Sequence, residues 1–267
     1  MTEVNDRPLA VVTGASSGIG HALAAELADH GYDLLVAAEN EEITKAPVRL
    51  ERPGAQVTAM RVDLSVPKEV EEFATKIKAL NRPVAVLAIN AGVGVSGGFV
   101  EDTTLKDQLT VVDLNVRSAV HLAKLIVPDM VDRAQGRVLF TSSIAATAPA
   151  PFQAVYHASK AFLQSFAQGL REELKGTGVT VTAAMPGPTE TRFFERAGMT
   201  DTKLGAGPKD DAAVVAKEAV QALLAGKDHV VTGSLRNKAQ SVVGHLLPDR
   251  MLTAIQRRAS APGTAKK

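Results

Sequence analysis

The sequence predicts one α/β domain built on a doubly wound parallel sheet of seven strands, with helices on both faces. Short apolar runs alternate along the chain with longer segments of helical periodicity. Several of these runs are apolar at successive positions, which is typical of strands that are covered on both faces. Strand–helix alternation predicts right-handed crossovers. No internal repeat or Gly/Ser linker divides the 267 residues, so we expect a single domain over 1–267.

The expected strands share runs of apolar and β-branched residues, at 9–13, 33–38, 55–62, 84–89, 137–142, 179–185 and 229–232. Helical patterns fill the gaps at 18–30, 67–80, 105–133, 153–175 and 210–225. Pro67 suits the first position of its helix, where a missing N–H costs nothing. The crossover 39–54 is the weakest, because Pro47 and Pro53 leave room for little helix.

Composition excludes several classes of function. The formal net charge is +1, so no global field favours nucleic acid, and we expect no nucleic-acid partner. The chain has no cysteine, which excludes disulfides, thiolate metal sites and cysteine nucleophiles, and we expect no metal. The first residues, MTEVNDRP, carry acids and no apolar core, and no stretch approaches the roughly 18 apolar residues of a membrane span. The cytoplasm is the expected compartment.

Two segments lie outside the strand–helix pattern. Residues 189–209 are irregular and rich in glycine, whereas 236–267 form a basic tail in which Asp249 is the single acid. The tail has apolar residues at roughly helical spacing, at Val242, Val243, Leu246, Leu247, Met251, Leu252 and Ile255. Such a helix could bind a membrane surface or a partner, or it could cover an apolar edge of its own domain. We favour the second, because Pro248 interrupts the apolar pattern, and so expect no membrane partner.

A glycine-rich turn, TGASSGIG, spans residues 13–20 where the first strand becomes a helix. Gly14 can make a tight turn, Gly18 lets the backbone approach a ligand, and Gly20 lets the helix lie against the sheet. The N-terminus of the helix then offers free N–H groups and a positive dipole to a pyrophosphate. An ordinary strand-to-helix turn would use one glycine, so three favour dinucleotide binding.

Further motifs follow in order: VDL with Asp63, NAG at 90–92, DLNV with Asn115, the spacing S-x12-Y-x3-K at Ser143, Tyr156 and Lys160, and Pro186-Gly187 before Thr189 and Thr191. This ordered set resembles the short-chain dehydrogenase/reductase family over roughly residues 8–233. The resemblance implies a Rossmann-like fold with strand order 3-2-1-4-5-6-7. It also implies a metal-free, nicotinamide-dependent alcohol dehydrogenase or carbonyl reductase.

The resemblance assigns Tyr156 as the acid/base, Lys160 as the group that tunes it, Ser143 as the residue that orients the substrate, and Asn115 as a proton relay that kinks its helix. A free tyrosine has a pKa of about 10, and lowering it to about 7 requires roughly 4 kcal/mol. The neighbouring ammonium and a positively charged nicotinamide are expected to provide this. Ser142 is the alternative to Ser143, which the twelve-residue gap favours. His157 lies about 100° round the helix from Tyr156 and is expected to face elsewhere.

The same resemblance places a nicotinamide cofactor against Gly14, Ser16, Ser17, Gly18, Ile19, Gly20, Glu39, Asp63, Leu64, Asn90, Ala91, Gly92, Tyr156, Lys160, Pro186, Gly187 and Thr189. Ser17 is neutral and the second strand ends in Ala38-Glu39, so no cation is placed for a 2′-phosphate and Glu39 would repel one. NAD(H) is therefore favoured over NADP(H). Pro188 lacks the N–H that often holds the carboxamide in this family, so Thr189 or another donor must serve.

The region around the expected site is mostly apolar. Residues 144–155, Phe193 and Phe194 indicate a pocket for a hydrophobic or neutral alcohol or ketone, although these residues could simply pack together. Residues 189–209 resemble the mobile substrate lid of the family. The helices 105–133 and 153–175 resemble its dimer-forming pair, so we expect a homodimer or homotetramer.

Two other functions are compatible with parts of the pattern. A non-catalytic NAD(P)-binding sensor or scaffold needs the glycine turn, but not Ser143, Tyr156 and Lys160 together. A sugar-nucleotide epimerase or dehydratase of the same fold usually has another glycine spacing and a longer C-terminal substrate region. The joint presence of the three side chains favours the oxidoreductase.

Overall fold

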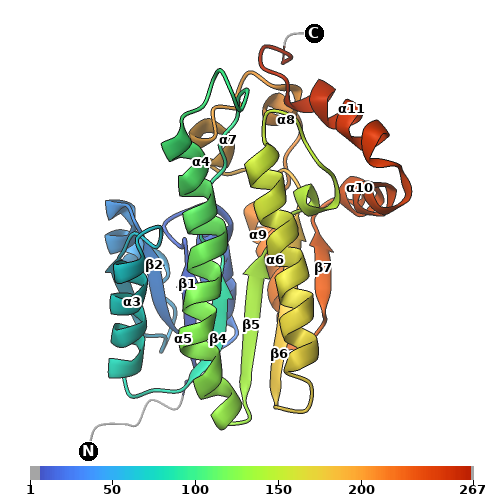
Figure 1. Ribbon diagram of the computed structural model, residues 1–267. Helices are drawn as coiled ribbons and strands as arrows, with labels where there is room; N and C mark the ends of the chain where they lie inside the picture. Colours follow the sequence, from blue (N-terminus) through green and yellow to red (C-terminus); the bar gives the residue numbers. More distant parts are fainter. Residues whose placement is uncertain (1–6, 266–267) are drawn as a thin grey trace, which may run out of the picture.

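The computed structural model describes residues 7–265, apart from the side chains of 242–246. All seven strands pair in parallel in one sheet, in the order β3-β2-β1-β4-β5-β6-β7 (Figure 1). The strands are β1 (Leu9–Thr13), β2 (Asp33–Ala38), β3 (Val57–Arg61), β4 (Val84–Ile89), β5 (Gly136–Thr141), β6 (Val179–Pro186) and β7 (His229–Thr232). The predicted fold class and strand order are confirmed.

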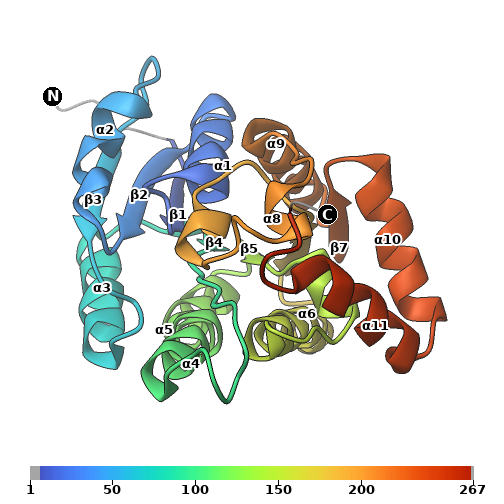
Figure 2. The ribbon, with the colours of Figure 1, turned by 90° about the horizontal axis from the view of Figure 1, so that it is seen from above.

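Helices cover both faces of the sheet, as the view from above shows (Figure 2). One face packs against α1 (Gly18–Asp29) and α9 (Ala212–Leu224), and the other against α3 (Pro67–Ala79), α5 (Ser118–Asp132) and α6 (Ala154–Glu173). Within β1, Leu9 and Val11 belong to one core and Ala10 and Val12 to the other. Successive strand residues face opposite sides, so burial of both faces explains the unbroken apolar runs.

The expected helix 105–133 is interrupted. It consists of α4 (Leu105–Val112), a π-helical turn η2 (Asp113–Arg117) and α5. Such a turn is one of the recognised causes of a helix bend. The weak crossover contains only the short 3-10 helix η1 (Glu41–Lys45) and α2 (Ala46–Arg49), as its prolines predict.

The two segments outside the pattern lie near each other, beyond the carboxyl ends of the strands (Figure 1). The segment 189–209 contains α7 (Phe193–Arg196) and α8 (Lys203–Ala206), joined by turns. The tail forms α10 (Leu235–Leu246), which contacts β7 and the short helix η3 (Ile144–Thr147), and α11 (Asp249–Ser260), which contacts α8. After α11, the N–H of Ala265 donates to the Asp201 carbonyl at 2.8 Å.

The tail therefore packs on its own domain, and Leu252 is buried there, while Met251 and Ile255 are about half exposed. The side chains of Val242, Val243 and Leu246 lie outside the described part of the chain. Among the helices that the structure describes, none is long and apolar enough to cross a membrane.

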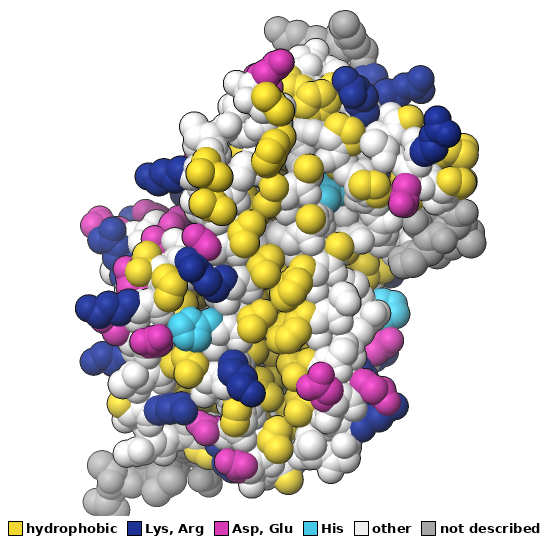
Figure 3. Space-filling model, in the orientation of Figure 1, with side chains coloured by type: hydrophobic (Ala, Val, Ile, Leu, Met, Phe, Trp, Pro, Cys, Tyr) yellow, Lys and Arg dark blue, Asp and Glu magenta, His cyan; other side chains and the backbone are white. Residues whose placement is uncertain are grey.

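One outer face carries a continuous column of hydrophobic side chains over α5 and α6 (Figure 3). The large exposed apolar residues of α4, α5 and α6 are Leu105, Leu109, Val112, Val120 and Phe162. Exposed apolar surface of this kind often marks an interaction site.

Candidate active site

The glycine turn has the backbone geometry that its sequence predicts. Gly14 has φ 69° and Gly18 has φ 58°, in the left-handed region that favours glycine. A Cβ on Gly14 would lie 2.8 Å from the Ala91 Cα, and one on Gly18 would lie 2.7 Å from the Thr191 Cγ2. A Cβ on Gly20 would collide with the Gly14 carbonyl. Close backbone approaches therefore require Gly14 and Gly20, whereas Gly18 is required by its φ angle and by the Thr191 side chain, and together they form a cradle beside Thr191.

The first turn of α1 opens toward the pocket. Ser17 is the N-cap residue, and its side chain makes no capping hydrogen bond. The first N–H groups of a helix lack intrahelical acceptors, so they are available to an anion. The Nδ2 of Asn40 donates to the Ser16 Oγ at 3.0 Å and ties the end of β2 to the turn. Ser16, Ser17, Gly18 and Ile19 line the same pocket as the residues described next.

The pocket continues past the ends of β2 and β3, where Glu39, Asp63 and Leu64 line it. The Asp63 Oδ1 accepts from the Ser65 N–H at 2.9 Å and the Ser65 hydroxyl at 2.7 Å, which fixes the carboxylate. Arg61 donates to the Glu39 carbonyl and pairs with Glu41 at 3.3 Å. The Arg61 guanidinium, which contacts the Glu39 backbone, is thus already paired with the Glu41 carboxylate.

The NAG turn is fixed to β1 by Thr13. The Thr13 Oγ1 accepts from the N–H groups of Asn90 and Ala91, each at 3.0 Å, and the Asn90 Nδ2 donates to the Thr13 carbonyl at 3.0 Å. A Cβ on Gly92 would lie 3.1 Å from the Asn115 Oδ1 and 3.3 Å from the Lys160 Nζ. The NAG turn therefore connects the part of the pocket lined by the glycine turn with Asn115 and Lys160, two of the predicted catalytic residues.

Asn115 lies in the π-helical turn and is buried. Its Oδ1 accepts from the Val93 N–H at 2.9 Å, and its Nδ2 donates to the Val93 carbonyl and the Ser159 Oγ, each at 2.9 Å. The side-chain amide thus joins the NAG turn to α6. Its role as a proton relay stays a prediction.

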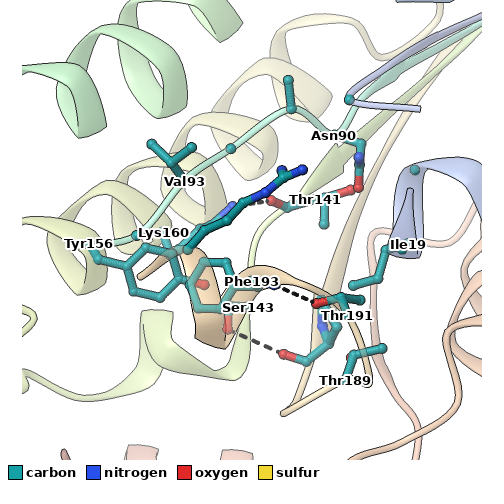
Figure 4. Close-up of a pocket in the computed structure, with 18 of the residues that line it drawn as sticks. Ile19, Asn90, Val93, Thr141, Ser143, Tyr156, Lys160, Thr189, Thr191 and Phe193 are labelled. Atoms are coloured by element: carbon teal, nitrogen blue, oxygen red, sulfur yellow. Dashed lines mark hydrogen bonds between the residues drawn. The ribbon is translucent and has the colours of Figure 1, made fainter. Parts of the chain in front are cut away.

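Ser143, Tyr156 and Lys160 lie on one side of the pocket, and Ile19, Thr189 and Thr191 lie across from them (Figure 4). The buried Lys160 Nζ donates to the Thr141 carbonyl at 2.8 Å and lies 5.8 Å from the centroid of the Tyr156 ring. These contacts place the ammonium near the Tyr156 ring, and both residues line the pocket.

The structure distinguishes the two candidate serines. The Ser143 Oγ donates to the Pro186 carbonyl at 3.2 Å and accepts from the Ala145 N–H at 3.0 Å. The Ser142 Oγ donates to the Lys160 carbonyl at 2.8 Å, and this hydrogen bond links the end of β5 to α6. Ser143 and Tyr156 both line the pocket, and the Ser143 hydroxyl is near enough to act on the pKa of the phenol. Ser143 is therefore the candidate for sharing a ligand with the phenol.

Burial controls the pKa values of Tyr156 and Lys160 in the chain without a ligand. Burial raises the pKa of Tyr156 to about 12, and the opposite effect of the Ser143 side chain is smaller. Burial also lowers the pKa of Lys160 to about 8. The expected lowering of the Tyr156 pKa toward 7 involves a bound, positively charged nicotinamide as well as Lys160, and it stays a prediction. Tyr156 is protonated at neutral pH, and any lowering requires further positive charge.

Lys160 should give the free energy of unfolding a distinct pH dependence. Its pKa is lowered to about 8 from the ordinary value of 10.5, so between these values the unfolded chain binds more protons than the folded one. Stability therefore rises with pH in this window, by ~2 kcal/mol between about pH 7.5 and 9.5. Urea unfolding at several pH values measures it. Lys160→Met should lack this rise, and parallel profiles for the two proteins would contradict the lowered pKa.

His157 and Pro188 hydrogen-bond to the backbone of other segments around the pocket. The His157 Nδ1 donates to the Ala148 carbonyl at 2.7 Å, and burial lowers the pKa of the imidazole. Pro188 has no N–H, but its carbonyl accepts from the Asp210 N–H at 2.8 Å. The Thr189 hydroxyl donates to the Gly187 carbonyl at 2.9 Å.

The segment 189–209 closes one side of the pocket. The Phe193 ring lies 5.1 Å from the Tyr156 ring, centroid to centroid. A Cβ on Gly94 would lie 2.6 Å from the Phe193 Cζ, so the phenylalanine fits against the glycine.

Sequence reasoning missed five polar residues that line the pocket: Gln153, Arg192, Arg196, Gln240 and Gln256. The expectation of few charged groups is corrected, because the exposed Arg192 and Arg196 both lie on its wall. Gln153 had a signal, since it is the one amide in the apolar segment 144–155. Gln240 and Gln256 had none, because nothing local indicates that α10 and α11 return to the pocket.

Comparison with known proteins identifies the family. A family model described as short chain dehydrogenase matches residues 8–201. The chain belongs to the short-chain dehydrogenase/reductase family. It is accordingly a Rossmann-fold, NAD(P)-dependent oxidoreductase.

Relatives and solved structures agree with this membership. The chain is 34% identical over 187 residues, 69% of its length and 74% of the relative's, to sulfoacetaldehyde reductase 2 of Chromohalobacter salexigens. It is 28% identical, over 96% of its length and 82% of the relative's, to the dehydrogenase/reductase SDR family protein 7-like of Drosophila melanogaster.

A short-chain dehydrogenase from Sphingobium yanoikuyae in complex with NADPH superposes with a TM-score of 0.78 at 28% identity, covering 89% of this chain and 92% of the other. A variant of the actinorhodin polyketide ketoreductase with NADPH superposes with a TM-score of 0.74 at 26% identity, covering 85% and 96%. These neighbours bind NADPH and give no support to NAD over NADP in this chain.

Proposed function

We propose that this enzyme transfers a hydride between a nicotinamide cofactor and an alcohol or ketone carbon, with Tyr156 as the acid/base. The observation that carries the proposal is one pocket lined by the glycine turn, Ser143, Tyr156 and Lys160. The glycine turn fits a dinucleotide, because Ser17, Gly18 and Ile19 at the N-terminus of α1 line the pocket and the first N–H groups of a helix are available to a pyrophosphate. The remaining residues that would hold the cofactor are Ser16, Ser17, Ile19, Gly20, Glu39, Asp63, Leu64, Asn90, Ala91, Gly92, Tyr156, Lys160, Pro186, Gly187 and Thr189.

When bound, the nicotinamide supplies or accepts the hydride. In the direction of reduction, the hydroxyls of Ser143 and Tyr156 hold the carbonyl oxygen, and Tyr156 gives it a proton as the carbon receives the hydride. The raised pKa of Tyr156 keeps that proton available at neutral pH. Lys160 then stabilises the phenolate that remains, and the NAG turn and Asn115 fix the position of α6.

We further propose that NAD(H) is preferred, because the Glu39 carboxylate lines the pocket where a 2′-phosphate would approach. The wild type should show at least about tenfold higher kcat/KM with NADH than with NADPH. Glu39→Gln should narrow that ratio by improving kcat/KM for NADPH. The matched control is Glu51→Gln, outside the residues lining the pocket. A wild type that prefers NADPH, or a ratio unmoved by Glu39→Gln, would contradict the assignment.

The substrate we propose is a neutral or hydrophobic carbonyl compound or alcohol. Phe193, Phe194, Met199 and Leu204 give the wall formed by 189–209 an apolar surface, and we propose that this segment acts as a lid. A panel of ketones and secondary alcohols, followed at the nicotinamide absorbance with each cofactor, tests the function. Turnover of at least one neutral ketone is expected. Absence of nicotinamide-linked turnover across the panel, with nucleotide binding intact, would instead favour a sensor or scaffold.

We also propose a homodimer or homotetramer. The support is the hydrophobic column over α5 and α6 (Figure 3), together with the exposed apolar side chains Leu105 and Leu109 of α4. Light scattering gives the molar mass in solution, and a monomer at micromolar concentration would contradict the proposal.

A further inference from the structure

Gln153 is a buried amide whose nitrogen the fold leaves without a protein partner among the described residues. It is the residue before α6, three positions before Tyr156, and it lines the same pocket. Only 4% of it is exposed, and its Nε2 has no hydrogen-bond partner in the described part of the chain. Gln153 is the N-cap residue of α6, so it precedes Tyr156 by less than one helical turn, and both residues line the pocket. A buried polar group without a partner is costly and uncommon in native structures.

The backbone next to Gln153 is held in an unusual conformation. Phe152 has φ 66°, in the left-handed region that a bulky residue rarely adopts. The Phe152 carbonyl accepts from the Gly97 N–H at 2.9 Å, and the Arg257 guanidinium lies 5.6 Å from its ring centroid. Contacts from two other segments therefore fix the strained backbone of Phe152, and with it the backbone position of Gln153.

The pocket that Gln153 lines has two further amide side chains. Gln240 from α10 and Gln256 from α11 also line it, and neither side chain is seen to hydrogen-bond another described residue. The acids that line the pocket are Glu39 and Asp63, which lie past the ends of β2 and β3, away from the phenol. In the part of the pocket that these glutamines line, an oxygen atom of a ligand is the natural partner of an amide donor.

We propose that Gln153 is a specificity-determining residue whose amide binds a second oxygen of the substrate, on a carbon close to the reacting carbonyl. This inference rests on the proposed function. The substrate class is therefore a hydroxyketone or keto ester, rather than a simple ketone. The apolar wall from 189–209 then covers the remainder of the molecule. A substrate without the second oxygen leaves the buried amide unpaired and is discriminated against for that reason.

The test compares ethyl acetoacetate with 2-octanone, which is of similar size and lacks the second oxygen function. Gln153→Met should lower kcat/KM for ethyl acetoacetate by roughly tenfold to a hundredfold and change that for 2-octanone by less than about threefold. The control is Gln164→Met, since Gln164 also has a buried unpaired amide atom on α6 but lies outside the residues lining the pocket. It should leave the ratio of the two substrates unchanged.

A second measurement needs no turnover. Without substrate, Gln153→Met should melt at the same or a higher temperature, because it removes a buried polar group without a partner. A marked fall in Tm, or an equal loss of kcat/KM on both substrates, would overturn the proposal. If the wild type acts on both substrates and Gln153→Met behaves like the wild type, the inference fails while the proposed function stands. Unchanged turnover in Tyr156→Phe would instead remove the proposed function.

Discussion

Tyr156→Phe should lower kcat by about 10²- to 10⁴-fold, the range expected when a positioned acid/base is removed. The variant deletes one hydroxyl and keeps the ring that packs at 5.1 Å against Phe193, so the pocket should keep its shape. Nucleotide binding should fall far less than kcat, because the substitution removes one hydroxyl from the proposed cofactor site and leaves the glycine turn and NAG turn untouched. Steady-state turnover and calorimetric titration with the cofactor measure the two effects separately.

The chain has a matched control in its only other tyrosine. Tyr32 is buried in the core between the sheet and α1, and it does not line the pocket. Tyr32→Phe should keep wild-type turnover. If Tyr156→Phe also turns over at the wild-type rate, Tyr156 is not the acid/base, whereas simultaneous loss of nucleotide binding would indicate a structural effect of the substitution.

Gly18→Val should weaken nucleotide binding by at least about a hundredfold. Its φ of 58° is strained for any β-branched residue, and its Cβ would lie 2.7 Å from the Thr191 Cγ2. The valine would therefore fill the cradle between α1 and the segment that begins with Thr189 and Thr191. A loss of this size corresponds to about 2.7 kcal/mol of binding free energy. Titration followed by the fluorescence of NADH measures it.

Gly31→Val separates backbone strain from filling of the cradle. Gly31 has φ 87°, and a Cβ there would meet nothing within 4 Å. Gly31→Val should lose stability through strain and keep its affinity for the nucleotide. Similar losses of affinity in both variants would mean that strain, not the close approach at Gly18, controls binding.

The sequence by itself determined the elements and their order, because these depend on short-range patterns. The boundaries of β1, β2, β4 and β7 agree with the predicted runs. Burial on both faces leaves β1, β2 and β4 a continuous apolar signal. The turn from Gly14 to Gly20 was also readable, because only glycine tolerates its conformation and close contacts. Tyr156 and Lys160 were predicted to share a helix face by their spacing, and both lie in α6 and line the pocket.

The tertiary structure alone decided the environment of these groups. The pKa of Tyr156 is raised because burial outweighs the opposing effect of Ser143, and burial is a sum over neighbours far apart in the chain. The unpaired amide of Gln153 depends on the Phe152 backbone and on what surrounds it, and Gln240 and Gln256 reach the pocket only because α10 and α11 fold back. Local sequence specifies conformation, whereas desolvation and hydrogen-bond partners are properties of the packed whole.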